Sequence, residues 1–314
     1  MMGSSFRIWP EQASTIAGRV DGLYGFLIAV AVFFSGLIFL LVLYFAIKYR
    51  RRPGNMRAQQ VGTHNWLEMT WILIPLALTM VVFVWGAKLY AMVMLSPPAN
   101  SLEVYAIGKQ WMWKFQHPDG QREIDELHVP VGHPVKMTMT SQDAIHSFYV
   151  PAFRIKMDVV PGRYTTTWFE ASKPGVYHLF CAEYCGTNHA RMRGRVIALP
   201  PTQYEEWLSS NRVQEPMATA GAHLFQQMGC AMCHGTALAP ALEGVFGSSV
   251  QLQNGATVLA DEDYMRESIL NPGAKLVAGY APIMPTFQGQ LSEEEITQLV
   301  AYIKSLRQKP SGGR

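Results

Sequence analysis

The four cysteines of this chain form two close pairs, and each pair has a histidine nearby. The first pair bounds the run C-A-E-Y-C, Cys181 to Cys185, and the second belongs to C-A-M-C-H, which ends at His234. Scattered cysteines would predict a disulfide framework, whereas clustered pairs beside histidine predict metal or cofactor chemistry. These two segments are therefore the first candidate functional sites.

The run that begins at Cys181 continues through G-T-N-H-A-R-M and adds His189 and Met192 to the two thiols. A further histidine, His146, lies 35 residues before Cys181, at the start of a predicted strand. Two thiolates, two imidazoles and a thioether are soft ligands, which select copper. Two cysteines four residues apart could bridge two copper ions, with one histidine on each ion. The weak ligands would then be Met192 and the backbone carbonyl of Glu183.

Three other interpretations of this cluster stay open. Cys181 and Cys185 could form a disulfide in an oxidising compartment. The thiols and histidines could form a structural Cys₂His₂ zinc site, although zinc would leave Met192 without a role. Met192 could also be an ordinary core methionine, although it ends a regularly spaced run of ligands.

The second cluster, Cys230 to His234, has the C-x-x-C-H spacing of covalent haem c attachment. In that chemistry Cys230 and Cys233 add to the haem vinyl groups and His234 ligates the iron. A thioredoxin-like pair and half of a zinc site are the alternatives, but no βαβ pattern and no second C-x-x-C accompany this motif. Met284 is the expected sixth ligand, because Met/His ligation raises the iron potential as an electron carrier requires. We prefer it to the other nearby methionines, Met228, Met232 and Met265.

Two long apolar segments near the N-terminus predict membrane spans. Residues 22–47 carry no charge and, at about 1.5 Å per residue, can cross a bilayer core of about 30 Å. Residues 69–87 are also uncharged, and the apolar pattern continues past Lys88 to residue 95, with Pro75 as a tolerated kink. Buried core helices rarely stay uncharged for so long, and a signal peptide has its basic residues before the apolar run. We therefore predict two spans, at about 22–47 and 69–95.

A basic cluster follows the first span, and by the positive-inside rule the loop between the spans is cytoplasmic. Both termini, and everything after the second span, are then expected on the periplasmic or outer side of a bacterial inner (cytoplasmic) membrane. The spans and this loop also explain why only 16% of the residues are charged. No segment is basic enough to predict a nucleic-acid partner. The basic residues are Lys48, Arg50, Arg51, Arg52 and Arg57.

The sequence pattern predicts a multidomain membrane protein, with a two-helix transmembrane hairpin in residues 1–95. Residues 96–210 show short β-branched and aromatic runs separated by Pro and Gly, as in a β-sandwich or barrel. Residues 211–218 are a predicted linker, and residues 219–314 hold the haem motif. This last part ends in a helical apolar pattern that follows a capping box at Ser292 and Glu295. The expected strands include Leu102–Ile107, Val135–Thr140, Ser147–Val150, Tyr164–Phe169, Val176–Phe180 and Val196–Leu199.

Together these motifs resemble those of cytochrome c oxidase subunit II. C-x-E-x-C-x-x-x-H-x-x-M, with H-S-F at His146, resembles the family's binuclear copper site. G-K-Q-W-M-W-K-F from Gly108 and K-x-D-x-x-P-G-R from Lys156 also fit. Residues 219–307 resemble a class I cytochrome c. The resemblance therefore implies an all-β cupredoxin-like domain followed by an all-α cytochrome c domain, as in subunit II of a caa3-type oxidase.

The resemblance implies roles for three further residues. Trp111 would be the residue where electrons reach the copper. Glu68, in E-x-x-W-x-x-x-P, would lie at the mouth of a proton pathway into subunit I, although by position alone it is a favourable partner of a helix dipole. The side chain of Glu183 would help to bind Mg²⁺ or Mn²⁺ at the interface with subunit I.

The implied function is electron transfer in a terminal respiratory oxidase. Electrons from a cytochrome or an upstream complex would enter at haem c, pass to the binuclear copper and continue to subunit I, where oxygen reduction is coupled to proton translocation. Subunit III and membrane lipid are further expected partners. The alternatives are a subunit of a copper-containing nitric oxide reductase, a membrane-tethered copper chaperone and a membrane-anchored electron shuttle. Four carboxylates could dock a basic cytochrome, although solvated surface groups are the preferred interpretation: Glu103, Asp119, Asp125 and Asp143.

Overall fold

The computed structural model describes residues 10–51, 62–94, 97–210 and 215–306. Contacts divide the chain into two compact units, residues 16–96 and the remainder. Parts of several sequence predictions lie outside the described residues: Arg52 and Arg57 of the basic loop, residue 95 of the second span, residues 211–214 of the linker and residues 307–314 of the last domain.

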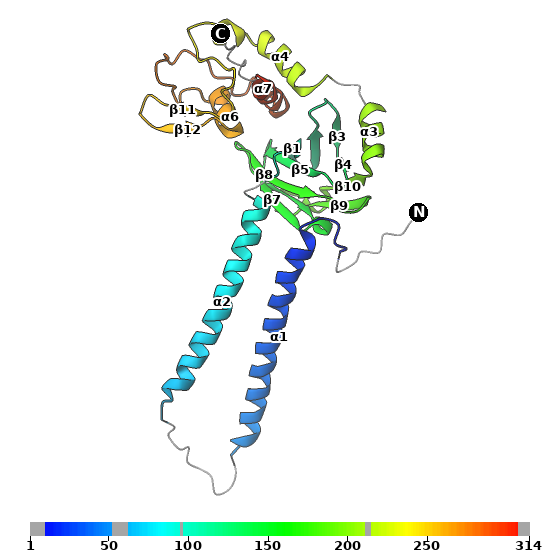
Figure 1. The fold of residues 1–314 in the computed structure, drawn as a ribbon, viewed down its shortest axis with the longest axis vertical. Helices are drawn as coiled ribbons and strands as arrows, with labels where there is room; N and C mark the ends of the chain where they lie inside the picture. The colour runs from blue at the N-terminus through cyan, green and yellow to red at the C-terminus, as the bar shows by residue number, and fades with distance from the viewer. Residues whose placement is uncertain (1–9, 52–61, 95–96, 211–214, 307–314) are drawn as a thin grey trace, which may run out of the picture. The chain divides into compact units, whose positions relative to one another are not determined.

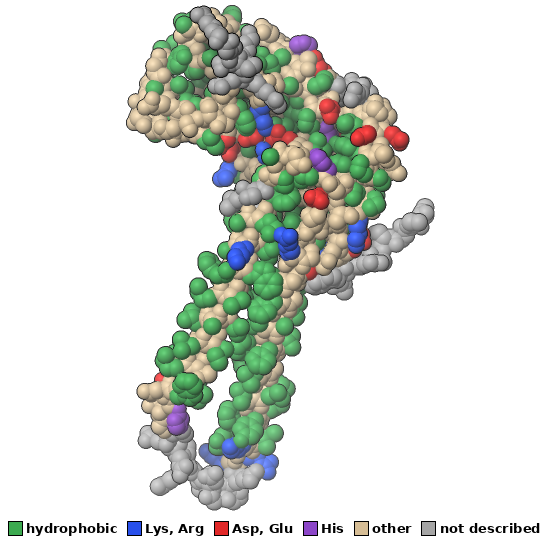
Figure 2. Space-filling view, viewed as in Figure 1, with side chains coloured by type: hydrophobic (Ala, Val, Ile, Leu, Met, Phe, Trp, Pro, Cys, Tyr) green, Lys and Arg blue, Asp and Glu red, His purple; other side chains and the backbone are tan. Residues whose placement is uncertain are grey.

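The smaller unit is a pair of long helices, α1 (Ala17–Lys48) and α2 (Asn65–Met94). Their most apolar windows have mean hydropathies of 3.0 and 2.1, and no residue of either window is buried. Figure 2 shows hydrophobic side chains over most of the visible surface of both helices. The rings of Phe26 and Trp85 pack at 5.8 Å and join the two helices. Both helices have the length and the exposed apolar surface of segments that lipid surrounds.

The larger unit contains a sandwich of two five-stranded sheets (Figure 1). All six strands expected from the sequence are present, as β1, β5, β6, β8, β9 and β10. The first sheet has the order β3-β2-β1-β5-β8 and the second β4-β10-β9-β6-β7. The bounds are β1 (Leu102–Lys109), β2 (Met112–Gln116), β3 (Arg122–Ile124), β4 (Glu126–Pro130), β5 (Pro134–Ser141), β6 (His146–Val150), β7 (Ile155–Val159), β8 (Thr165–Glu170), β9 (Gly175–Cys181) and β10 (Arg193–Leu199).

Alternation of side chains along these strands builds the core, and the pairing of the strands brings the copper candidates together. Apolar residues at every second position, such as Phe115, Phe148 and Leu179, are fully buried between the sheets. β6 begins at His146, β9 ends at Cys181, and the two strands pair antiparallel with Phe148 opposite Cys181. The start of one strand therefore meets the end of the other, which brings together residues that are 35 positions apart.

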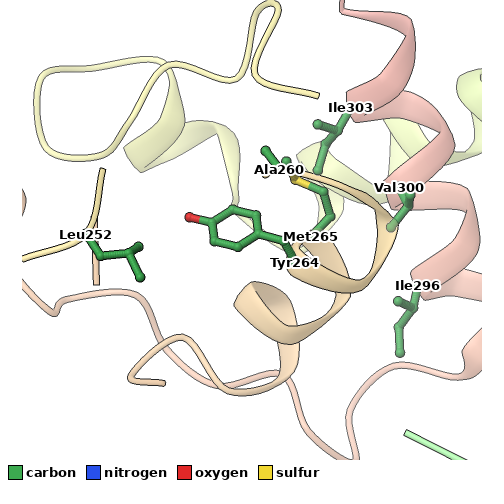
Figure 3. Close-up of a cluster of buried hydrophobic side chains, with 7 residues drawn as sticks. All are labelled: Leu252, Ala260, Tyr264, Met265, Ile296, Val300 and Ile303. Atoms are coloured by element: carbon green, nitrogen blue, oxygen red, sulfur yellow. The ribbon is translucent and has the colours of Figure 1, made fainter. Parts of the chain in front are cut away.

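The sandwich is followed by α3 (Pro201–Ser210) and then by a haem-motif domain of short helices. This domain contains α4 (Met217–Gln227), α5 (Ala231–His234), α6 (Glu262–Leu270) and α7 (Glu293–Ser305). The predicted capping box is confirmed: Ser292 Oγ accepts from the Glu295 backbone, and the Glu295 carboxylate accepts from the Ser292 backbone. In Figure 3 the apolar side chains of Ile296, Val300 and Ile303 project from α7 toward α6.

The helix pair α4 and α7 crosses closely at Gly221. A Cβ at this position would collide with the backbone carbonyl of Gln298, so only glycine fits. Two features add detail to the sequence expectation. A short two-stranded sheet, β11 (Ser249–Gln251) and β12 (Thr257–Leu259), accompanies the helices, and α4 begins at Met217, within the segment 211–218 that was expected to be linker.

Candidate copper and haem sites

The copper candidates form a continuous chain of donor atoms. Cys181 Sγ lies 3.9 Å from His146 Nδ1 and 3.7 Å from Cys185 Sγ. Cys185 Sγ in turn lies 3.5 Å from His189 Nδ1 and 3.8 Å from Met192 Sδ. Both thiols are free, so the disulfide alternative is not what the structure contains. Each thiol thus lies beside a histidine of its own.

The two predicted weak donors lie beside the same thiols. The backbone carbonyl of Glu183 is 3.3 Å from Cys181 Sγ, while the Glu183 side chain is exposed. Met192 is fully buried, yet its sulfur faces a thiol rather than only core carbon. Thiolate, imidazole, thioether and carbonyl donors together fit copper better than zinc, which gains nothing from a thioether.

The protonation of the two thiols explains why this cluster suits a cation. Burial by itself raises the pKa of Cys181, but the hydrogen bond from His146 and the nearby backbone outweigh it and lower that pKa to about 6. Burial and the charge of Cys181 raise the pKa of Cys185 to about 12. One thiolate therefore opposes the formation of the other. Both thiols would have to be deprotonated to hold a cation, and a bound cation would favour that state.

An outer layer of hydrogen bonds orients the donors. Nε2 of His146 lies 2.8 Å from Oδ1 of Asp143, whose other oxygen accepts from the Gln110 backbone at 2.8 Å. Because Asp143 holds Nε2, the ring of His146 is oriented with Nδ1 toward the sulfur of Cys181. Asp143 is exposed, as expected of a surface carboxylate, but one of its oxygens also contacts the His146 ring. The D-A-I-H spacing, Asp143 to His146, is a signal that could have found this pair.

Trp111 lies directly against the loop that carries the second thiol. Its Nε1 donates to the carbonyl of Cys185 at 3.2 Å, and Nε2 of Gln110 donates to the same oxygen at 2.7 Å. Gly186 permits this packing: its φ is +112°, and a Cβ there would lie 3.1 Å from Gln110 Nε2 and 3.4 Å from the Trp111 ring. The Trp111 indole thus contacts the backbone of Cys185, whose thiol is a candidate copper ligand.

The haem motif opens into an apolar cavity. His234 and Met284 both line a cavity of about 460 Å³, and Cys230 lines a smaller hollow that shares both residues. Nδ1 of His234 lies 2.9 Å from the carbonyl of Pro240, which leaves Nε2 for an iron atom. Further apolar lining comes from Phe225, Leu242, Ile269, Phe287, Leu299 and Ile303. An apolar pocket between a histidine and a methionine fits a haem.

The structure separates the candidate methionines. Met284 is half-buried at the cavity wall, whereas Met232 is 74% exposed. Met265 also lines the cavity, but it is buried in the cluster that joins α6 to α7. Met228 packs against the neighbouring apolar cluster and is not among the lining residues.

Comparisons with known proteins agree with this geometry. Residues 120–198 match the family described as cytochrome c oxidase subunit II, periplasmic domain, and residues 218–307 match cytochrome c. Cytochrome c oxidase subunit 2 from Alkalihalophilus pseudofirmus is 33% identical over 297 residues, which cover 89% of this chain and 85% of that protein. The chain belongs to the cytochrome c oxidase subunit 2 family.

Two further similarities cover parts of the chain. Cytochrome c oxidase subunit 2 from Synechocystis is 27% identical and covers 67% of this chain and 77% of its own length. The crystal structure of the periplasmic domain of subunit II from Bradyrhizobium japonicum is 30% identical, with a TM-score of 0.36, and aligns with 37% of this chain and 97% of that domain. This subunit 2 is an electron-transfer subunit of a cytochrome c oxidase, and the reductase and chaperone alternatives are not favoured.

The remaining candidates of this subunit 2 each have other surroundings. Glu68 lies in the first turn of α2 and is partly exposed. Asp125 accepts from the backbone N–H of Trp113 at 2.7 Å, and Asp119 is exposed as expected. Glu103 was expected to be a solvated carboxylate, which is wrong: it is held by two lysines, Lys136 and Lys304.

Proposed function

We propose that this subunit carries electrons from a covalently bound haem c to a binuclear copper centre, and from there to the oxygen-reducing subunit I. The observation that carries this proposal is the pairing of each thiol of one site with its own histidine, in a chain that also holds a haem-sized cavity behind C-x-x-C-H. Copper and haem iron supply one-electron redox chemistry when bound.

The chain's own residues perform the holding and shielding. His146, Cys181, Cys185 and His189 would bind two copper ions, with Met192 and the Glu183 carbonyl as weak ligands. Burial of the sulfurs and of Met192 excludes water, so that little reorganisation accompanies a change of charge. Trp111 would receive electrons beside this centre, since its indole lies against the Cys185 carbonyl.

At the haem, Cys230 and Cys233 would form the thioether bonds, and His234 with Met284 would supply the axial ligands. The Pro240 carbonyl supports this role of His234, because it holds the ring in one orientation and favours the tautomer that leaves Nε2 for the metal. A cytochrome or an upstream complex would be the electron donor.

Finer features of the complex belong to the same proposal. We infer a caa3-type oxidase with subunits I and III, in which α1 and α2 both span the inner membrane and the copper and haem domains face the periplasm. Glu68 would accept protons at the mouth of a pathway into subunit I. The exposed side chain of Glu183 would help to hold Mg²⁺ or Mn²⁺ against subunit I, while its carbonyl would serve as a weak copper ligand.

The test is metal analysis and spectroscopy on the full-length chain in detergent. We expect two copper ions and one haem per chain, a mixed-valence two-copper electron paramagnetic resonance signal and the optical band of a low-spin haem c. His189→Ala should remove the mixed-valence signal and leave the haem band unchanged. A zinc-loaded protein without a copper signal would overturn the copper assignment.

A further inference from the structure

The haem domain contacts the copper domain through a charged and polar face of α6 and α7. Thr297 Oγ1 donates to the side chain of Gln116 at 3.2 Å, and both residues are buried. Arg266 donates to the backbone carbonyl of Gly162 at 2.6 Å, and the Asp263 carboxylate accepts from the Tyr164 backbone at 2.6 Å. These contacts join residues about 100 to 180 positions apart, so only docking of the two domains creates them.

Four charges form an alternating square at the centre of this face. Within the copper domain, Glu103 pairs with Lys136 at 3.1 Å, and within the haem domain Glu262 pairs with Lys304 at 2.9 Å. Two further pairs cross between the domains: Lys304 to Glu103 at 2.6 Å and Lys136 to Glu262 at 3.2 Å. The four side chains are only 16–24% exposed. Each charge thus has one partner in its own domain and one in the other.

Such a square specifies orientation more than it adds net stability. Taking charges out of water costs free energy that their attraction offsets only when every partner is in place. A shifted or rotated haem domain would leave half-buried charges unpaired or facing like charges, which costs several kcal/mol. The same square also holds Lys304 4.9 Å from the centre of the Phe246 ring, which packs against the α6–α7 cluster.

Helix α7 connects this face to both candidate redox sites. Near its start, Glu294 pairs with Lys114 at 2.6 Å and accepts from Gln142 at 3.2 Å. Gln142 directly precedes Asp143, the residue that orients His146. Further along the same helix, Leu299 and Ile303 line the haem cavity. One helix therefore fixes the position of the haem cavity relative to the copper donors.

We propose that the square of Glu103, Lys136, Glu262 and Lys304 is an intramolecular docking surface that fixes the haem domain on its own copper domain in one orientation. Its consequence for electron transfer rests on the proposed function. The partner of this surface is thus the second domain of the same chain, recognised by complementary charge, and not an external cytochrome.

The test exchanges charges within one domain at a time. Glu103→Lys with Lys136→Glu, the copper-side exchange, keeps the net charge and the pair within that domain but puts like charges across both interdomain pairs. Glu262→Lys with Lys304→Glu, the haem-side exchange, does the same from the other side. Combining all four substitutions restores opposite charges across the interface.

The readouts are hydrogen exchange of β1 and α7 and the rate at which a photoreduced haem passes its electron to copper, on the full-length loaded chain. In each variant with charges swapped on one side only, amide hydrogen exchange in β1 and α7 should become faster and the electron-transfer rate should fall by about tenfold or more. The fourfold variant should recover most of the protection from hydrogen exchange and most of the transfer rate. Lys304→Met carries the same expectation if a single-side exchange does not load its cofactors. As a matched control, Arg195→Met removes an exposed ion pair with Glu126 in the copper domain and should change neither readout.

If both single-side variants show the hydrogen-exchange protection and the electron-transfer rate of the wild type, the proposed docking surface is overturned. Failure of the proposed function would look different: the wild-type chain would protect β1 and α7 from exchange in a charge-dependent way, yet no electron would reach copper. A fourfold variant that recovers neither readout would also contradict the proposal. Opposite charges across the interface would then not be what holds the two domains together.

Discussion

The imidazole of His146 is held between a thiol and a carboxylate: Nδ1 faces Cys181 Sγ at 3.9 Å, and Nε2 lies 2.8 Å from Oδ1 of Asp143. Hydrogen bonds to Asp143 from His146 and from the backbones of Gln110 and Ala144 outweigh its burial and lower its pKa, so the carboxylate is charged at neutral pH. Asp143 thereby fixes the orientation of the His146 ring.

Replacing this carboxylate tests its orienting role. Asp143→Asn should lower copper affinity by about 10- to 100-fold, as expected for loss of a partner that orients a ligand. Copper titration with a competing chelator measures the change. Asp119→Asn, at an exposed carboxylate of the same domain, is the control and should leave the affinity unchanged. Equal affinities in the two variants would contradict the role of Asp143.

Gly108 lies against the same imidazole from the other side. A Cβ at this position would be 2.8 Å from Cδ2 of His146, so Gly108→Ala should displace the ring at a cost of about 1–3 kcal/mol. We expect weaker copper binding and an altered copper spectrum, with an intact haem band. Gly62→Ala adds a Cβ where no atom lies within 4 Å and serves as the control. An unaltered copper spectrum in Gly108→Ala would show that the ring can move freely.

The choice of axial methionine is tested at the haem. Met284→Ala should abolish the Met–iron charge-transfer band and lower the haem reduction potential, because a thioether ligand raises it. Met265→Leu conserves volume in the α6–α7 cluster and should retain the band. If Met265→Leu loses the band and Met284→Ala retains it, Met265 is the ligand instead.

The close crossing of α4 and α7 predicts a stability effect. Gly221→Ala would gain helix propensity, but its Cβ would collide with the Gln298 carbonyl, so we expect a net loss of about 1–3 kcal/mol. Denaturant unfolding followed by haem absorbance measures this change. Thr219→Ala, at an exposed position of the same helix, should be neutral or slightly stabilising. A stabilised Gly221→Ala variant would mean that the helices separate without cost.

The charge square predicts a pH range for interdomain docking. Burial raises the pKa of Glu103 and of Glu262, but the two lysines outweigh it and hold both pKa values below 4.5. Burial lowers the pKa of Lys304, but the two carboxylates outweigh it and raise that pKa above 10.5. The carboxylate contribution is therefore present above about pH 4.5 and lost on acidification, whereas the Lys304 contribution is present below about pH 10.5 and lost at higher pH.

Burial also raises the pKa of Tyr105, so the Tyr105 hydroxyl stays neutral between these two pH limits and adds no charge to the square. Hydrogen-exchange protection of β1 and α7 should thus stay constant between these limits and fall as the pH drops below about 4.5. Glu103→Gln removes one of the two carboxylates and should weaken the acid-dependent loss. An acid-dependent loss of equal size in Glu103→Gln would assign it to other groups.

The sequence alone predicted copper and haem c chemistry, because the candidate ligands lie mostly within two short motifs. Cys181, Cys185, His189 and Met192 occupy one loop, so their spacing alone predicts soft ligands around a metal. The same holds for C-A-M-C-H. The two long apolar helices and the strands were also predictable, since long uncharged runs and alternating apolar residues have few other stable arrangements.

Only the tertiary structure decided which distant residues complete these sites. His146 reaches Cys181 through the antiparallel pairing of β6 and β9, and Asp143 became an orienting residue through that contact. Glu103 has the sequence context of a surface carboxylate, and only docking of α7 on β1 supplies its second lysine, 201 residues away. The charge of a residue does not specify where that residue lies in the fold. Whether a carboxylate is solvated or buried in an ion pair therefore depends on what the folded chain places beside it.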